Sequence, residues 1–77
     1  MKGSIKSVIN KKKFGFIKCP DNREFFFHYE DFNGHWNDLS DDYDAGQYIE
    51  VEFIEDKTDK GLRARNVRRL DYPNQAA

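Results

Sequence analysis

The sequence has little cysteine and no long apolar run. Cys19 stands alone among 77 residues, so no disulfide can form within the chain, which fits a reducing compartment. The mean hydropathy is -0.96, and no run of apolar residues is long enough for a secretory signal or a membrane-spanning helix. These absences predict a cytosolic protein without a membrane segment.

Side-chain sets that would hold a metal or perform catalysis are also missing. One cysteine and two histidines do not make a zinc set. Residues 38–44 alternate like the start of a calcium loop, but Tyr43 stands at the required glycine and Ile49 at the closing glutamate. No nucleophile has a base at a supporting spacing. We therefore expect no cofactor and no enzymatic activity.

Net charge is small, but charge of each sign is unevenly distributed. The formal net charge is -1, yet residues 1–20 contain six lysines and no acid. Residues 21–60 contain thirteen acids against three basic residues, and residues 61–77 contain four arginines against one acid. A folded chain with one basic face would suit nucleic acid, and whether both basic ends share a face is open at this point.

Most of the chain consists of short segments with strand-like alternation. At 77 residues it is one domain, with a core of marginal size. We expect five strands, at residues 4–9, 14–18, 24–29, 47–55 and 62–70, separated by polar turns. Residues 31–46 form an irregular piece, either a helical turn or a pinned loop, and no segment has a convincing helical period. The pattern predicts an all-β fold, a five-stranded antiparallel barrel, followed by a frayed polar tail at 71–77.

Alternation within the strands predicts which side chains face the interior. In the first strand, Ile5, Ser7 and Ile9 are expected on one face and Val8 on the other. In the fifth strand the arginines are expected to point outward. The inward positions predicted for the fourth and fifth strands are Ile49, Val51, Phe53, Leu62, Ala64 and Val67.

The most informative stretch is Lys12-Lys13-Phe14-Gly15-Phe16-Ile17. In a strand, Gly15 and Ile17 share one face and make a suitable inward pair, which leaves both phenylalanines outward beside the lysines. Exposed phenylalanine marks a contact surface, and flat rings beside lysines suit stacked bases with a phosphate backbone. The alternative, in another register, is that both rings belong to the core.

These residues resemble the cold-shock domain, an oligonucleotide-binding five-stranded barrel of the OB-fold type. The stretch at 12–17 is similar to its first ribonucleoprotein motif, Lys-Gly-Phe-Gly-Phe-Ile, and residues 25–29 are similar to its second, Val-Phe-Val-His-Phe. Residues 3–6, Gly46-Gln47 and the segment from Lys60 to Val67 fit other parts of the family pattern. The resemblance covers about residues 3–70, which predicts a cold-shock domain at 1–70.

The resemblance implies a set of nucleic-acid-binding residues. Phenylalanine and histidine side chains of the two motifs would stack on bases, while Phe25 and Phe27 would belong to the core. Lysines would contact phosphates, and Tyr29 would lie at the edge of the aromatic surface. Trp36 has two interpretations, a plug that fixes the loop or a base contact. The full expected set is Lys6, Lys12, Lys13, Phe14, Phe16, Phe26, His28, Tyr29, Trp36 and Lys60.

The chain departs from the family pattern at three positions and in the loop after the third strand, which is longer and carries an acidic run. Ser7-Val8 replaces the usual Trp-Phe, and Lys13 replaces a glycine. Each lost ring removes about 1–3 kcal/mol of stacking energy per base. The arginines of the last strand are equally compatible with nucleic-acid contact and with protection of a strand edge.

Two functions follow from these observations. The first is binding of single-stranded RNA or DNA by a monomer, in the manner of an RNA chaperone that holds strands unpaired. The second is a protein-interaction or dimerisation barrel with weak or lost nucleic-acid binding, such as a homodimer through exposed strands. Ser7-Val8, the net charge of -1 and the acidic segment 38–44 favour the second.

Overall fold

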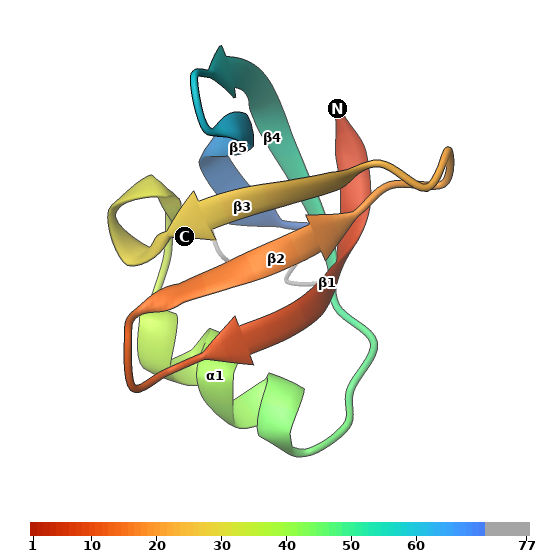
Figure 1. Cartoon of the computed structure of the whole chain (residues 1–77). Coiled ribbons are helices and arrows are strands. Elements are labelled where there is room, and N and C mark those ends of the chain that lie inside the picture. Colours follow the sequence, from red (N-terminus) through yellow and green to blue (C-terminus); the bar gives the residue numbers. More distant parts are fainter. Residues whose placement is uncertain (71–77) are drawn as a thin grey trace.

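The computed structural model describes residues 1–70, which form a closed five-stranded barrel with strand order β1-β2-β3-β5-β4 (Figure 1). The predicted five-stranded all-β barrel of the OB-fold type is confirmed, and the predicted tail at 71–77 lies outside the described residues. The elements are β1 (Lys2–Ile9), β2 (Phe14–Lys18), β3 (Glu24–His28), the 3-10 turn η1 (Tyr29–Asp31), α1 (Trp36–Asp44), β4 (Glu50–Thr58) and β5 (Gly61–Arg69).

One strand pair of this mainly antiparallel barrel is parallel. The pairs β1–β2, β2–β3, β1–β4 and β4–β5 are antiparallel, whereas β3 and β5 pair in parallel through Phe26 and Arg63. Strand directions cannot alternate all the way around a closed ring with an odd number of strands. A five-stranded closed barrel therefore contains at least one parallel pair.

The core is built from the inward positions that alternation and, for β3, the family resemblance predict. Phe25, Phe27, Val51, Ala64 and Val67 are fully buried. The remaining predicted positions follow the same pattern: Ile49 and Phe53 are buried, and Leu62 packs against the core. The inward side of the barrel is thus closed by large apolar side chains from β3, β4 and β5.

Gly15 is required by the close approach of three elements. A Cβ at this position would lie 2.6 Å from the carbonyl oxygen of Ser7 on β1 and 2.9 Å from the ring of Phe27 on β3. Because a side chain has no room there, β2 can pass between β1 and the Phe27 ring only with glycine between its two phenylalanines. Those phenylalanines are thereby held on the outward face.

A β-bulge in β1 reverses the alternation that the sequence predicts for that strand. Ile5 pairs with Ile17 and Ser7 pairs with Phe16, so one extra residue lies between them. Beyond the bulge, Val8 faces inward and packs against the core, whereas Ser7 lies on the side of Phe16. The predicted common face of Ile5 and Ser7 was therefore wrong.

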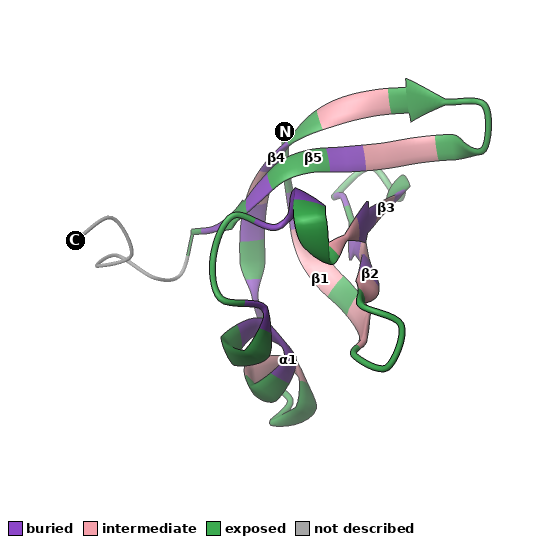
Figure 2. Ribbon diagram, turned by 90° about the vertical axis from the view of Figure 1, so that its left-hand side faces the viewer, coloured by how far each residue is buried: buried purple, intermediate pink, exposed green. Residues whose placement is uncertain are grey.

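The segment after β3 contains a helix, which confirms the helical alternative for residues 31–46, whereas the prediction that no segment has a helical period was wrong. Trp36, Leu39 and Ser40 of α1 are buried, and Tyr43 is partly buried, which is the spacing of one helical face. Acids in the last turn of α1 oppose the helix dipole. Packing therefore stabilises this helix, which lies beneath β1 at the lower end of the barrel in Figures 1 and 2.

Arg69 joins α1 to β5 and is buried, contrary to the prediction that every arginine of the fifth strand points outward. Its side chain is 1% exposed, and its Nη1 donates to Asp42 Oδ2 at 2.8 Å. The pairing partner lies 27 residues away in sequence, so local alternation does not indicate it. Within residues 1–70, neither helical segment has the length or the apolar character that crossing a bilayer requires.

Candidate nucleic-acid interface

Four ring-bearing side chains lie together on the outward face of β2 and β3. Phe16 pairs across the strands with Phe26, and Phe14 pairs with His28. All four are partly buried, while their neighbours along the strands, such as Phe27, face the core. We call Phe14, Phe16, Phe26 and His28 the platform; the sequence predicts that they adjoin, and the register brings them together.

The phenylalanines of the platform support one another. The ring centroids of Phe14 and Phe26 are 5.4 Å apart, and those of Phe16 and Phe26 are 5.9 Å apart. Phe14 meets Phe16 edge to face at 5.8 Å. Tilted and edge-to-face contacts of this kind are favourable arrangements of aromatic rings. The rings are consequently held in place without insertion into the core, and each keeps part of its surface open.

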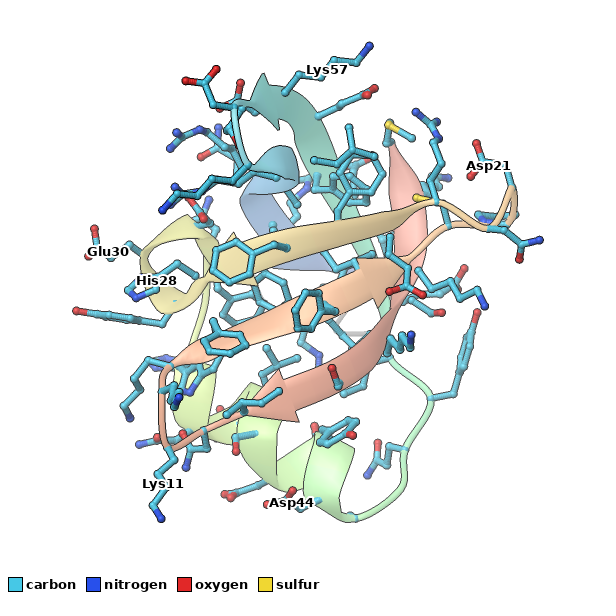
Figure 3. All side chains as sticks on the ribbon, in the orientation of Figure 1. Lys11, Asp21, His28, Glu30, Asp44 and Lys57 are labelled. Carbon is cyan, nitrogen blue, oxygen red and sulfur yellow. The ribbon has the colours of Figure 1, made fainter. Side chains whose placement is uncertain are left out.

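The His28 end of the platform is fixed by η1. The backbone N–H of His28 donates to Asp31 Oδ2 at 3.0 Å, and the His28 Nδ1 accepts from the backbone N–H of Glu30 at 3.5 Å. Figure 3 shows His28 and Glu30 side by side at this edge of the barrel. The ring of Tyr29, 46% exposed, lies 4.7 Å from that of His28 and extends the aromatic surface.

Asp31 is a buried carboxylate that sequence reasoning missed. It is 7% exposed, and its Oδ2 also accepts from Arg63 Nε at 2.9 Å, while Arg65 Nη1 lies 3.6 Å from Oδ1. These contacts join the end of β3 to β5 and orient Arg63 at the platform edge. The signal that could have found Asp31 is its place three residues after His28, where a capping box puts an acid.

Two hollows continue the platform at its borders. The hairpin groove, about 440 Å³, lies between the rings of Phe16 and Phe26 and the turn joining β4 to β5. The helix groove, about 560 Å³, lies between the β1–β2 turn, η1 and the start of α1. The residues that line the hairpin groove include Thr58, Lys60, Leu62 and Arg63, and those that line the helix groove include Lys13, Tyr29, His35 and Trp36. His35 is a further residue that sequence reasoning missed.

The lysines predicted to contact phosphates differ in their surroundings. Lys12, Lys13 and Lys60 are exposed and form no ion pair within residues 1–70. Lys60 lines the hairpin groove and Lys13 the helix groove, so positive charge borders the platform on both sides. Lys6 instead donates to Glu24 at 2.7 Å, and this hydrogen bond lowers the pKa of the Glu24 carboxyl.

The arginines of β5 all have acidic partners. Besides the Arg63–Asp31 and Arg69–Asp42 pairs, Arg65 Nε donates to Asp56 at 2.7 Å, which raises the Arg65 pKa. Arg68 Nε donates to Glu52 at 2.8 Å and lowers the Glu52 pKa. The positive charge of this strand is therefore directed at acids of the same chain.

Comparison with known proteins identifies the family. Residues 1–70 match the model of the 'Cold-shock' DNA-binding domain. The chain belongs to the cold-shock domain family. It is also 37% identical over 68 residues to the retron Se72 cold shock-like protein of Salmonella heidelberg (strain 579083-10), covering 88% of this chain and 96% of that relative. Nucleic-acid binding is the general function of this non-enzymatic family. Within residues 1–70, no three histidine, cysteine or acidic side chains gather in a way that could hold a metal ion.

Trp36 of this cold-shock domain lies in the core rather than on the platform. It is 9% exposed, and its ring packs against those of Phe27 at 5.8 Å and Phe32 at 6.3 Å. Its Nε1 donates to Asn10 Oδ1 at 2.8 Å, which ties the start of α1 to the β1–β2 turn. The plug is thus the interpretation that matches its packing, although the residue also lines the helix groove.

Lys13 occupies a cold-shock glycine position and keeps a glycine-like backbone. Its φ is 60°, in the left-handed region, and its carbonyl oxygen accepts from the backbone N–H of Tyr29 at 2.9 Å. The substitution therefore preserves the turn, adds a charge beside the platform and leaves backbone strain at this residue.

Proposed function

We propose that this protein binds single-stranded RNA or DNA by stacking bases on the platform and holding phosphates on the unpaired lysines beside it. The observation that carries the proposal is the group of four half-exposed rings on one sheet face. A soluble barrel gains little stability from rings in that position, whereas every nucleobase offers a flat face that fits them. Phe14, Phe16, Phe26 and His28 would each take part in stacking.

The phosphate backbone would follow the cationic borders of the platform. Lys12 and Lys13 in the β1–β2 turn and Lys60 in the hairpin groove lack acidic partners within residues 1–70, so their charge is available to a ligand. Phosphate contacts of this kind are insensitive to sequence. Stacking is also tolerant of sequence, so we expect weak preference among bases and binding to both RNA and DNA.

The mechanism is passive and would make the protein an RNA chaperone. Bases that lie on the platform have their flat faces covered and are held away from a pairing partner. Binding would shift the equilibrium of a hairpin toward its open strand by mass action, without consuming energy. A duplex, whose base faces are stacked inside the helix, would contact only the lysines.

Titration of labelled oligo-U and oligo-dT at increasing salt tests the proposal. Each phosphate neutralised on a single strand contributes about -0.7 to the slope of log affinity against log salt, so three lysines predict a slope of about -2. Lys60→Gln should reduce the magnitude of that slope by about 0.7. Lys57→Gln is the matched control, because Lys57 lines neither groove and extends from the far end of β4 in Figure 3.

A quenched hairpin RNA measures the chaperone step separately. We expect the protein to open the hairpin at concentrations that saturate oligo-U binding. Absence of binding to either oligonucleotide at low salt would contradict the proposal. A stable oligomer in light scattering together with that absence would favour the protein-interaction barrel instead.

A further inference from the structure

A third groove lies at the end of the platform opposite His28. It measures about 420 Å³, and the residues that line it include Lys2, Gly3, Lys18, Asn22, Tyr48 and Glu50. This end of the barrel carries the β2–β3 turn, marked by Asp21 in Figure 3. We call it the Tyr48 groove; none of the ten residues predicted for binding lines it.

The Tyr48 groove is continuous with the platform along β2. Phe14, Phe16 and Lys18 alternate on the outward face of this strand, with buried residues between them. Two residues of a strand span about 6.6 Å, so Lys18 follows Phe16 at roughly the spacing of one nucleotide. A strand that leaves Phe16 in this direction reaches Lys18 beside the Lys6–Glu24 ion pair, because Glu24 lies opposite Lys18 on β3.

Tyr48 is an aromatic ring without a place in the core. It is 74% exposed, more than any other large apolar or aromatic side chain within residues 1–70. The backbone beside it is nevertheless held, because Ile49 is buried and its carbonyl oxygen accepts from the N–H of Ile5 at 2.9 Å. The ring is therefore presented from an anchored position.

The charges in the groove favour an anion. Lys2 and Lys18 are exposed and form no ion pair within the described part of the chain. The position of Lys2 is fixed, since both backbone groups of Met1 bond to Phe53 at 2.8 Å. Glu50 is the acid that lines this groove, whereas Glu24 and Glu52, which lie across the strands from Lys18 and Lys2, are outside its lining.

We propose that Tyr48, Lys2 and Lys18 form an accessory site for the nucleotides that extend beyond the platform. Tyr48 would stack on one base, and the two lysines would hold the adjoining phosphates. The inference rests on the proposed function and adds to it a longer binding path, from the His28 edge across Phe16 to the Tyr48 groove. Glu50 would weaken phosphate binding there.

Affinity as a function of oligonucleotide length tests this site. Oligo-dT of roughly six nucleotides should cover the platform, and oligo-dT of roughly ten should also reach the Tyr48 groove. Tyr48→Ala should leave the short oligonucleotide's affinity unchanged and weaken binding of the long one by about fivefold, the lower end expected for one stacked base. Glu50→Gln should strengthen binding of the long oligonucleotide alone.

Ile54→Ala is the matched control, because Ile54 is also exposed, at 58%, and does not line the Tyr48 groove. Equal affinities of Tyr48→Ala and the unsubstituted protein for the long oligonucleotide would overturn the accessory site while leaving the platform intact. If the unsubstituted protein does not bind the short oligonucleotide, the proposed function itself is overturned. Equal weakening of both lengths by Tyr48→Ala would also overturn the accessory site.

Discussion

The lysines beside the platform and the arginines of β5 use positive charge in opposite ways. Beside the platform, Lys12, Lys13 and Lys60 have no acidic partner within residues 1–70. On β5 the cations are arginines, and each is paired with an acid of the same chain. The planar guanidinium suits fixed pairs with carboxylates, whereas the flexible ammonium suits a mobile ligand.

This difference explains how a chain with a net charge of -1 can present a basic binding face. Arginine pairs neutralise part of the acidic middle segment, and further acids lie on α1, such as Asp44 at the lower end of the barrel in Figure 3. The unpaired lysines are left to set the local potential around the platform. The distribution of charge, and not its sum, is what bears on binding.

The largest expected effect is a difference in stability between alanine substitutions on the two faces of β3. Phe27→Ala removes a fully buried ring and should destabilise the fold by about 3–5 kcal/mol, nearly all the stability of a domain this small. Phe26→Ala removes a half-exposed ring and should lower the free energy of unfolding by about 1 kcal/mol or less. Urea unfolding of both variants checks this, and equal destabilisation would contradict the assignment of the two faces.

Substitution of two adjacent arginines of β5 should also change stability by different amounts. Arg69→Met leaves Asp42 without its buried partner and should cost about 3 kcal/mol of stability. Arg68→Met breaks a pair whose arginine side chain is 61% exposed and should cost about 0–1 kcal/mol. Thermal unfolding of the two variants compares them directly. A larger loss for Arg68→Met would show that the buried pair does not hold α1 on the barrel.

Ser7→Trp should add a ring to the platform. The bulge places Ser7 opposite Phe16, on the outward side, so a tryptophan there would adjoin the existing rings. Oligo-U binding should become tighter by about fivefold or more, since one stacked base contributes about 1–3 kcal/mol. Val8→Trp is the control: Val8 packs against the core, and the larger ring should destabilise the fold by about 1–3 kcal/mol. Unchanged affinity of Ser7→Trp would mean that the nucleic acid does not pass over β1.

Lys13→Gly should separate backbone strain from charge. Glycine adopts a φ of 60° without steric penalty, so stability should rise by about 0.5–1 kcal/mol after the entropy of the unfolded chain is counted. The salt slope of oligo-U binding should shrink by about 0.7 because one lysine is lost. Lys12→Gly should show the same change in slope without the gain in stability. A loss of stability in Lys13→Gly would contradict the claim that the backbone of Lys13 is strained.

The sequence predicts the platform well because its signals are local. Phe14 and Phe16 flank a glycine, and Phe25, Phe26 and Phe27 leave one of two faces outward, so alternation and the family resemblance agree on the same strands. The outward position predicted for Arg69 was wrong for a long-range reason, since its burial follows from a partner 27 residues away.

The bulge in β1 was missed, and the helix α1 was predicted only as one of two alternatives, both for a local reason. The bulge in β1 adds one residue without any glycine or proline to mark it. The helix α1 has apolar residues at helical spacing, Trp36, Leu39 and Tyr43, but acids and a preceding glycine hide that period. In both places tertiary packing overrides a weak local preference.

The measurement that tests the account most directly is oligo-U affinity of a variant carrying both Phe16→Ala and Phe26→Ala. The two rings pair across β2 and β3, and their loss should weaken binding by about thirtyfold or more at one salt concentration, at about 1–3 kcal/mol per base. Circular dichroism should show that the barrel is still folded. A folded double variant that binds oligo-U as tightly as the unsubstituted protein would contradict base stacking on the platform.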